Sequence, residues 1–275
     1  MFRKILVGTD GSETAKLAVA HAVQLSAAMD AELIVATAHA SSDAGRRRRG
    51  HRRPATSAVG EPQAAIAHAL LRDAVHTHGA AARVRGVAVS GPPGEALVEL
   101  AAREAVELVV VGNRGMGRAA WAPLSGVPDR VSHRAPTSVL IVDTMGGRRP
   151  GYSRILVGTD GSPTSLRAVE VAVSLAEALQ AEVTAAAAGD AEATDRALAP
   201  VRSRWPSVAT AILEGPPATA LVNLAESGAF DLLVVGNRGI AGPRRLLGSV
   251  PDRVAHEART SVLIVATGGD AGGGC

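Results

Sequence analysis

The sequence has very few aromatic residues and a single cysteine, and these shortages exclude several classes of protein. Aromatic side chains make up 2% of the 275 residues and hydrophobic ones 47%, so the core must be built from Ala, Val, Leu and Ile. One cysteine, Cys275, cannot form a disulfide within the chain, which favours a reducing compartment. The sequence also has no apolar run approaching the roughly 20 residues that span a bilayer, and no signal peptide pattern. We therefore expect a cytoplasmic protein without a membrane segment.

Positive charge is concentrated in one short segment, although the net charge of the chain is only +3. Arg46–Arg53 contains six arginines and one histidine. The simplest interpretation is a solvated loop, and the alternatives are a phosphate-steering arm or a patch for nucleic acid or acidic partners. Single-stranded nucleic acids are commonly bound through aromatic side chains that stack on the bases, so the shortage of aromatics argues against nucleic acid as a partner.

The chain contains two copies of one sequence. KILVGTDGS, VVVGNRG and SVLIV, at residues 4–12, 109–115 and 138–142, return almost unchanged at residues 154–162, 233–239 and 261–265. The second copy is shorter after its second strand, which removes the arginine segment and part of the second helix. We place two domains at residues 1–146 and 152–267, joined by the linker Gly146–Gly151 and followed by a flexible tail at residues 268–275.

Each copy alternates between short apolar runs and amphipathic stretches. In the first copy the pattern predicts strands at residues 4–9, 33–38, 83–89, 107–112 and 138–142, and helices at residues 13–29, 62–78, 94–105 and 126–133, with Ser12 as an N-cap. Near-continuous Val, Ile and Leu runs are typical of parallel strands buried on both faces. The predicted fold class is α/β, with two tandem open parallel sheets covered by helices on both faces in a Rossmann-like manner.

Polar and glycine-rich segments follow the first and fourth predicted strands of both copies. Asp10 and Asp160 follow the first strand, and Gly112 and Gly236 end the fourth. The carboxyl ends of the strands are where open α/β sheets bind ligands. A carboxylate there can accept hydrogen bonds from ribose or adenine, and a glycine-rich loop entering a helix can bind phosphates. The structural alternative is that Asp10 only forms an Asx turn beside the helix cap.

Each half resembles the universal stress protein family. The resemblance lies in ILVGTDGS, in GNRG after a Val-rich strand, and in DRV followed by SVLIV. It implies five parallel strands in the order 3-2-1-4-5 and, in one branch of the family, binding of ATP with or without Mg²⁺. That branch carries Gly-x2-Gly-x9-Gly-[Ser/Thr] for the phosphates and an Asp after the first strand for the adenosine, which corresponds to Asp10 and Asp160.

The phosphate motif is degenerate in both copies. In the first copy it closes on Ser125-Gly126, in reversed order, and Ser125 would be strained if its position requires a positive φ. In the second copy the loop is one residue shorter and closes on Gly248-Ser249. We favour the first copy on the adenine side and the second on the phosphate side. The candidate nucleotide-binding residues are Asp10, Ala38, Gly112, Arg114, Gly115, Ser125, Gly126, Asp160, Gly236, Arg238, Gly239, Gly248 and Ser249.

The sequence leaves two functions open. One is a stress-response regulatory protein that binds ATP or another adenine nucleotide without substantial catalytic turnover and acts on an unidentified protein partner. The other is an ATP-independent interaction scaffold that kept the fold while the phosphate motif decayed. An ATP-hydrolysing enzyme ranks third, because the sequence has no P-loop, no Gly-x-Ser-x-Gly elbow and no Cys/His cluster with metal spacing. We assign no catalytic residue and no metal site.

The fifth strands, Ser138–Val142 and Ser261–Val265, are expected to join the two halves. An unpaired edge strand exposes backbone groups and apolar side chains, and pairing with its counterpart covers both. The family resemblance implies the same arrangement, because its members commonly dimerise through this strand and a tandem chain supplies both partners. We also expect the whole chain to form a homodimer.

Overall fold

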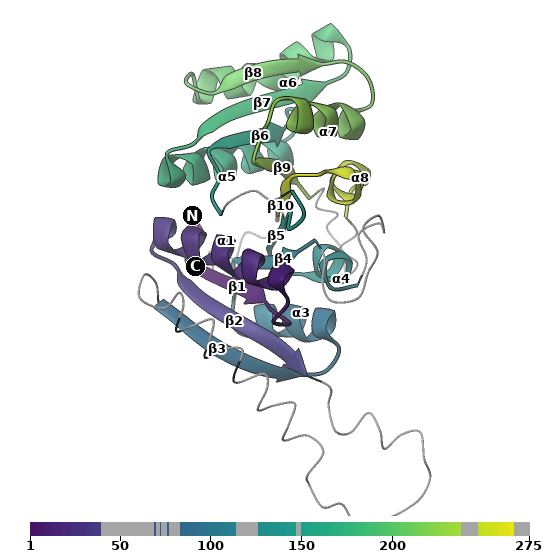
Figure 1. Ribbon diagram of the computed structural model, residues 1–275. Coiled ribbons are helices and arrows are strands. Elements are labelled where there is room, and N and C mark those ends of the chain that lie inside the picture. Colours follow the sequence, from purple (N-terminus) through teal and green to yellow (C-terminus); the bar gives the residue numbers. More distant parts are fainter. Residues whose placement is uncertain are drawn as a thin grey trace, which may run out of the picture.

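The structure, a computed structural model, describes residues 1–39, 69, 72, 76, 83–113, 126–146, 150–237 and 247–266. Its strands form a ten-stranded sheet with helices on both faces (Figure 1). The α/β class predicted from the sequence is confirmed. The two expected five-stranded sheets are continuous with each other, because their fifth strands are hydrogen-bonded together.

The described elements of the first half follow the predicted order. They are β1 (Lys4–Gly8), α1 (Glu13–Met29), β2 (Glu32–His39), β3 (Arg83–Ser90), α3 (Pro93–Arg103), β4 (Leu108–Gly112), α4 (Val127–Arg134) and β5 (Ser138–Val142). Their ends lie within one or two residues of the predicted ones. The arginine segment Arg46–Arg53 lies outside the described residues, as does most of the helix predicted at residues 62–78.

The second half repeats this order. Its elements are β6 (Arg154–Gly158), α5 (Pro163–Leu179), β7 (Glu182–Ala188), α6 (Ala191–Arg204), β8 (Ala209–Leu213), α7 (Pro217–Ser227), β9 (Leu232–Gly236), α8 (Ser249–Glu257) and β10 (Ser261–Val265). A shortened second helix was expected here. Helix α6 nevertheless spans 14 residues and begins immediately after its N-cap Asp190, so the connection from β7 is very short.

Serine side chains begin the first helix of each half. Ser12 Oγ accepts a hydrogen bond from Ala15 N at 3.2 Å, and Ser162 Oγ accepts one from Ser165 N at 3.3 Å. The predicted N-cap at Ser12 is thus confirmed. Helices α1 and α5 end at residues in the left-handed conformation, which turns the chain towards the next strand. In the ranges that the structure describes, no helix is both long and apolar enough to cross a membrane.

The order of the strands is β3-β2-β1-β4-β5-β10-β9-β6-β7-β8. Within each half the neighbouring strands are parallel, and the order 3-2-1-4-5 implied by the family resemblance is confirmed. Strands β5 and β10 are antiparallel, with Leu140 opposite Leu263 at the centre of their ladder. The predicted pairing of the fifth strands is therefore confirmed, and we call this ladder the seam.

Two apolar layers cover the two faces of the sheet. Because side chains alternate along a strand, Ile5 faces the layer of α1, α5 and α6, whereas Leu6 faces the layer of α3, α4, α7 and α8. Both layers continue from one half into the other, and the layer that contains Ile5 also contains Leu140 and Leu263. The two halves therefore share their hydrophobic core across the seam.

Side-chain hydroxyls extend the seam at both ends. Ser261 Oγ accepts a hydrogen bond from Asp143 N, and Ser138 Oγ accepts one from Ala266 N, each at 3.1 Å. Asp143 also fixes the start of the linker between the halves, since its carboxylate accepts hydrogen bonds from Met145 N and Gly146 N at 3.1 Å. The chain is thus held in place directly after β5.

The central leucines of the seam give a direct test of its contribution. Leu140 and Leu263 are each 1% exposed, so Leu140→Lys with Leu263→Lys places two like charges face to face in the core. We expect the free energy of unfolding in urea to fall by about 4 kcal/mol or more. Ile212→Lys is the matched control, because Ile212 lies in the edge strand β8 and is 53% exposed. Its effect should stay within about 0.5 kcal/mol. Unchanged stability and hydrodynamic size of the double variant would contradict the seam.

Candidate functional site

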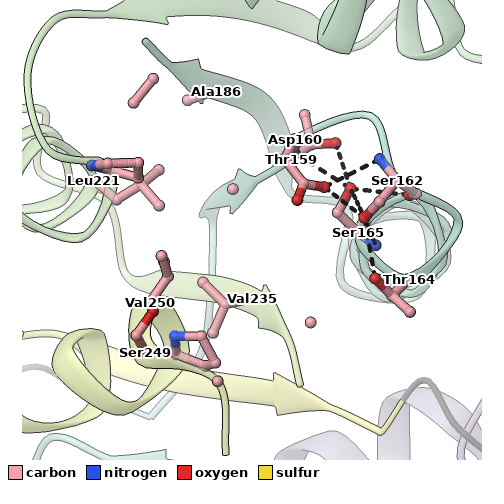
Figure 2. Close-up of a pocket in the computed structure, with 16 residues that line it drawn as sticks. Thr159, Asp160, Ser162, Thr164, Ser165, Ala186, Leu221, Val235, Ser249 and Val250 are labelled. Atoms are coloured by element: carbon pink, nitrogen blue, oxygen red, sulfur yellow. Dashed lines mark hydrogen bonds between the residues drawn. The ribbon is translucent and has the colours of Figure 1, made fainter. Parts of the chain in front are cut away.

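A cavity of about 280 Å³ lies at the carboxyl ends of β6, β7 and β9, and we call it the second-half cavity. The loop after β6 supplies Asp160 and Ser162, the end of β7 supplies Ala186 and Ala188, and β9 ends at Gly236. The first turn of α8 and the side chain of Leu221 from α7 complete the wall (Figure 2). The cavity thus occupies the edge of the sheet at which the sequence predicted a ligand.

The Asp160 loop is held by hydrogen bonds within itself. Asp160 Oδ1 accepts bonds from Ser162 N at 3.0 Å and from Ser162 Oγ at 2.5 Å. Asp10 Oδ1 accepts the equivalent bonds from Ser12 at 3.0 and 2.6 Å. Asp10 and Asp160 therefore each form an Asx turn. A carboxylate oriented by its turn can also contact a ligand, so the structural role and a binding role are compatible.

The Asp160 carboxylate is ionised at neutral pH. Burial raises the pKa of Asp160, but hydrogen bonds from Ser162 and Ser165 outweigh it and hold the pKa below its ordinary value. The side chain itself is exposed at the rim of the cavity. A negative hydrogen-bond acceptor therefore stands at this side of the cavity over the physiological pH range.

Ser165 ties the loop to the first turn of α5, and the sequence analysis missed it. Its Oγ lies 2.9 Å from Thr159 Oγ1, accepts a hydrogen bond from Asp160 N at 3.3 Å and donates one to Ser162 O at 3.0 Å (Figure 2). The first half has Ala15 at the equivalent position and lacks this hydroxyl. The signal was present in the sequence, because Ser165 lies one helical turn after the N-cap Ser162.

Close packing behind the cavity explains the glycine at the end of β6. A Cβ on Gly158 would lie 2.7 Å from Leu221 Cδ1, and a Cβ on Gly8 would lie equally close to Leu97 Cδ1 in the first half. A larger residue would therefore force the leucine side chain to move. The glycine thus lets the helix approach the strand end and shape the wall of the site.

Helix α8 presents its N-terminus to the second-half cavity. Its N-cap Gly248 makes no side-chain cap, and the amides of Ser249 and Val250 have no carbonyl partner within the helix. Ser249 and Val250 line the cavity on a different side from the Asp160 loop (Figure 2). Backbone N–H groups and the helix dipole make this end of α8 suited to an anion.

The equivalent helix of the first half begins differently. Its N-cap is Gly126 with φ of 79°, whereas the α8 N-cap Gly248 has φ of −67°. Gly248 aligns with Ser125 and has no positive φ, so the second half shows no requirement for positive φ at that position. Ser125 itself lies outside the described residues. In the first half, the reversed Ser-Gly order places Gly126 at the position that has a positive φ. When the two copies are aligned, α4 begins one residue later than α8.

The structure brings several predicted residues of the first half to one edge. Asp10 follows β1, Ala38 lies near the end of β2, Gly112 ends β4, and Gly126 precedes α4. In the second half, Asp160, Gly236, Gly248 and Ser249 all line the cavity. The other predicted residues lie outside the described part of the chain, namely Arg114, Gly115, Ser125, Arg238 and Gly239.

Comparison with known proteins identifies the family. Residues 1–143, 151–202 and 184–266 match the model of the Universal stress protein family, so the match is repeated along the chain. The chain belongs to the universal stress protein family. It is a tandem member, since both halves match the same model.

Relatives support this assignment. A universal stress protein of Mycobacterium tuberculosis is 37% identical over 145 residues, which cover 52% of this chain and 97% of the relative. Another from the same organism is 31% identical over 205 residues, covering 66% of this chain and 68% of that protein. The crystal structure of a universal stress protein from Archaeoglobus fulgidus superposes with a TM-score of 0.75 at 20% identity and covers 97% of each chain. This last similarity concerns the fold alone.

The two N-cap glycines form a matched pair for a stability measurement. Gly126 has φ of 79° and ψ of −126°, which side-chain-bearing residues rarely adopt, whereas the extended conformation of Gly248 suits any residue. A Cβ at Gly126 would meet no atom within 4 Å, so the conformation alone decides the effect. Gly126→Ala should lower the free energy of unfolding by about 1–2 kcal/mol, and Gly248→Ala should change it by less than about 0.5 kcal/mol. Equal effects in urea denaturation would contradict the different helix starts.

Proposed function

We propose that this protein is a stress-response regulator that binds an adenine nucleotide, ATP in the first instance, in the second-half cavity. One observation carries the proposal. An ionised carboxylate loop and a helix N-terminus without a side-chain cap line the same cavity from different sides. A nucleotide needs both, because its sugar and base offer hydrogen-bond donors at one end and its phosphates carry negative charge at the other.

The lining residues suggest how the ligand would lie. Asp160 would accept hydrogen bonds from the ribose hydroxyls or the adenine amino group. Ala186 and Ala188, at the end of β7, have small side chains that leave room for a flat base. Ser249 and Val250 would donate their amides to the phosphates at the start of α8. If ATP binds together with Mg²⁺, the phosphates would carry the Mg²⁺ into the site.

The first half offers an equivalent set, and we propose a second nucleotide site there. Asp10, Ala38, Gly112 and Gly126 lie on its ligand-binding edge, and Arg114, Gly115 and Ser125 complete the proposal from the sequence. In the second half Arg238 and Gly239 play the same part. The wall of the second-half cavity includes both the Asp160 carboxylate and the N-terminus of α8, so we propose the second half as the stronger site.

Regulation without turnover is the mode of action that we propose. The described residues that line the cavity are Gly, Thr, Asp, Ser, Ala, Pro, Leu and Val, and the only titratable one is Asp160, which already accepts two hydrogen bonds from Ser162. A protein partner would then distinguish the nucleotide-bound chain from the nucleotide-free chain. We also propose that the chain forms a homodimer.

An ATP-independent scaffold is the second candidate, favoured by the reversed Ser125-Gly126 pair and the shortened loop of the second copy. Mass spectrometry of the small molecules released from freshly purified, denatured protein separates the two candidates. An adenine nucleotide in stoichiometric amount supports the binding function. Its absence, together with no calorimetric binding of added ATP, supports the scaffold.

The carboxylates after β1 and β6 give the direct test of the proposed sites. Asp10→Ala combined with Asp160→Ala should weaken ATP binding at least tenfold, or about 1.4 kcal/mol, in isothermal titration calorimetry. Asp190→Ala is the control, because it removes the same charge from the N-cap of α6, outside the lining residues. Unchanged ATP affinity in a folded double variant would exclude the proposed sites. Equal weakening in the Asp190 control would point to a general loss of stability rather than to the proposed sites.

Turnover gives an independent prediction. Phosphate release from ATP by the purified protein should be far slower than the roughly 10 per second typical of enzymes. The measurement is single-turnover hydrolysis at saturating protein, with Mg²⁺ present. A rate near the enzymatic median that persists after further purification would overturn the assignment as a non-enzyme.

A further inference from the structure

Two equivalent pairs of side chains meet between α4 and α8, and the proposed nucleotide sites use none of them. Asp129 and His133 belong to α4, and Asp252 and His256 belong to α8. His133 Nε2 lies 3.3 Å from Asp252 Oδ1, and His256 Nε2 lies 3.7 Å from Asp129 Oδ1. Within each helix, Nδ1 of the histidine lies 3.5 Å from its own Asp Oδ1. The four side chains alternate in a ring, which we call the His–Asp ring.

The partners of the ring nitrogens determine which protonation state suits this geometry. Each Nδ1 also faces a backbone carbonyl four residues earlier, at 2.9 Å from Asp129 O for His133 and 2.8 Å from Asp252 O for His256. Both nitrogens of each imidazole thus face oxygen acceptors. A neutral imidazole has one N–H, so in either tautomer a lone pair would face an oxygen. The imidazolium has two N–H groups, so Nδ1 can donate to the carbonyl while the positive ring faces the carboxylate of the other helix as an ion pair.

A neighbouring hydroxyl does not change this conclusion. Ser132 Oγ lies 3.3 Å from His133 Nδ1, but it donates its own hydrogen to Asp129 O at 2.9 Å. At the equivalent position before His256 stands Ala255, which has no hydroxyl. The two halves of the ring therefore present the same arrangement of oxygen atoms to their histidines.

The other charged groups on these helices are engaged elsewhere or point to solvent. Arg130 forms an ion pair with Glu95 of α3, and Arg253 forms one with Glu257 at 3.1 Å and a hydrogen bond to Thr219 of α7. Arg134 is exposed at the end of α4. Strands β5 and β10, against which α4 and α8 pack, carry only Ser, Val, Leu and Ile. Among the described residues, the ion pairs of Asp129 and Asp252 all lie within the ring.

We propose that the His–Asp ring is a proton-operated clasp that ties α4 to α8 across the seam. With both histidines protonated, two positive and two negative charges alternate around the ring and attract each other. With both neutral, two carboxylates remain beside imidazole lone pairs, and the attraction between the helices is lost. The side chains are between 27% and 41% exposed, so protons from solvent reach them freely.

The clasp connects the two ligand-binding edges. Helices α4 and α8 follow directly on Gly126 and Gly248, which belong to the phosphate side of each half in the proposed function. Asp129 and Asp252 lie in the first turns of these helices, and each contacts a histidine from the other helix. Acidification should therefore tighten the contact between the phosphate-side helices of the two halves.

Urea unfolding of two double variants tests the clasp. The first double variant combines His133→Gln and His256→Gln, and the second combines Asp129→Asn and Asp252→Asn. Both are compared with the parent at pH 5.5 and pH 8.5, on either side of the ordinary histidine pKa of about 6.5. In each variant the loss in the folding equilibrium constant should be about fivefold larger at pH 5.5 than at pH 8.5, as expected for two part-exposed ion pairs. His76→Gln, at an exposed position away from the ring, is the control and should show no such dependence.

Comparing each variant with the parent at the same pH cancels the contribution of the buried His21 to the pH dependence of stability. Burial lowers the pKa of His21 to about 4, against an opposing contribution from Asp143. The unfolded chain binds this proton near pH 6.5 and the folded chain only near pH 4, so His21 destabilises the fold as the pH falls through this range. This contribution has the opposite sign to the clasp, and the parent and all variants share it.

Amide hydrogen exchange gives a readout that is local to the seam. At pH 5.5 the amides of α4 and α8 should exchange faster in both double variants than in the parent, and at pH 8.5 the rates should agree. A loss of stability that is equal at both pH values would mean that the ring only fills space, and would overturn the proposal. No loss at either pH, or faster exchange confined to other elements, would overturn it as well.

Discussion

The antiparallel ladder between β5 and β10 is the contact on which the rest of the structure depends. Without this pairing, each of the two strands would be the edge strand of its five-stranded sheet and would expose unpaired backbone groups and apolar side chains. Pairing Leu140 with Leu263 covers both strands and joins the apolar layers on both faces into layers that span the molecule. Because β5 and β10 run in opposite directions, the carboxyl ends of the parallel strands of the two halves lie at opposite edges of the common sheet.

Most of the fold could be predicted from the sequence because its causes are local and repeated. Apolar runs such as residues 138–142 specify buried strands by composition alone, and Ser12 specifies a helix start through a bond to a residue three positions away. The seam followed from the need to cover an edge strand. In each case the physical reason acts over a few residues or applies to any parallel sheet.

The site was harder to predict because small conformational choices decide it. Gly126 and Gly248 are both glycines before a helix, but only Gly126 has a positive φ, and the reversed order with serine did not reveal which. Ser165 acts through bonds to three neighbours that meet only after the loop has folded. The His–Asp ring needs two helices from different halves, and no spacing within one copy encodes their approach.

The linker between β5 and β6 has a consequence for how the two copies can diverge. Since both lie on one chain, forming the seam is a unimolecular event, and dilution does not weaken it as it would a contact between separate chains. In a symmetric dimer of identical chains, every substitution also appears at both equivalent positions. Here each copy mutates alone, so a hydroxyl can stand at residue 165 and a methyl group at residue 15 while the shared ladder stays intact. Covalent linkage thus lets the two proposed nucleotide sites acquire different affinities while the interface between the halves is kept.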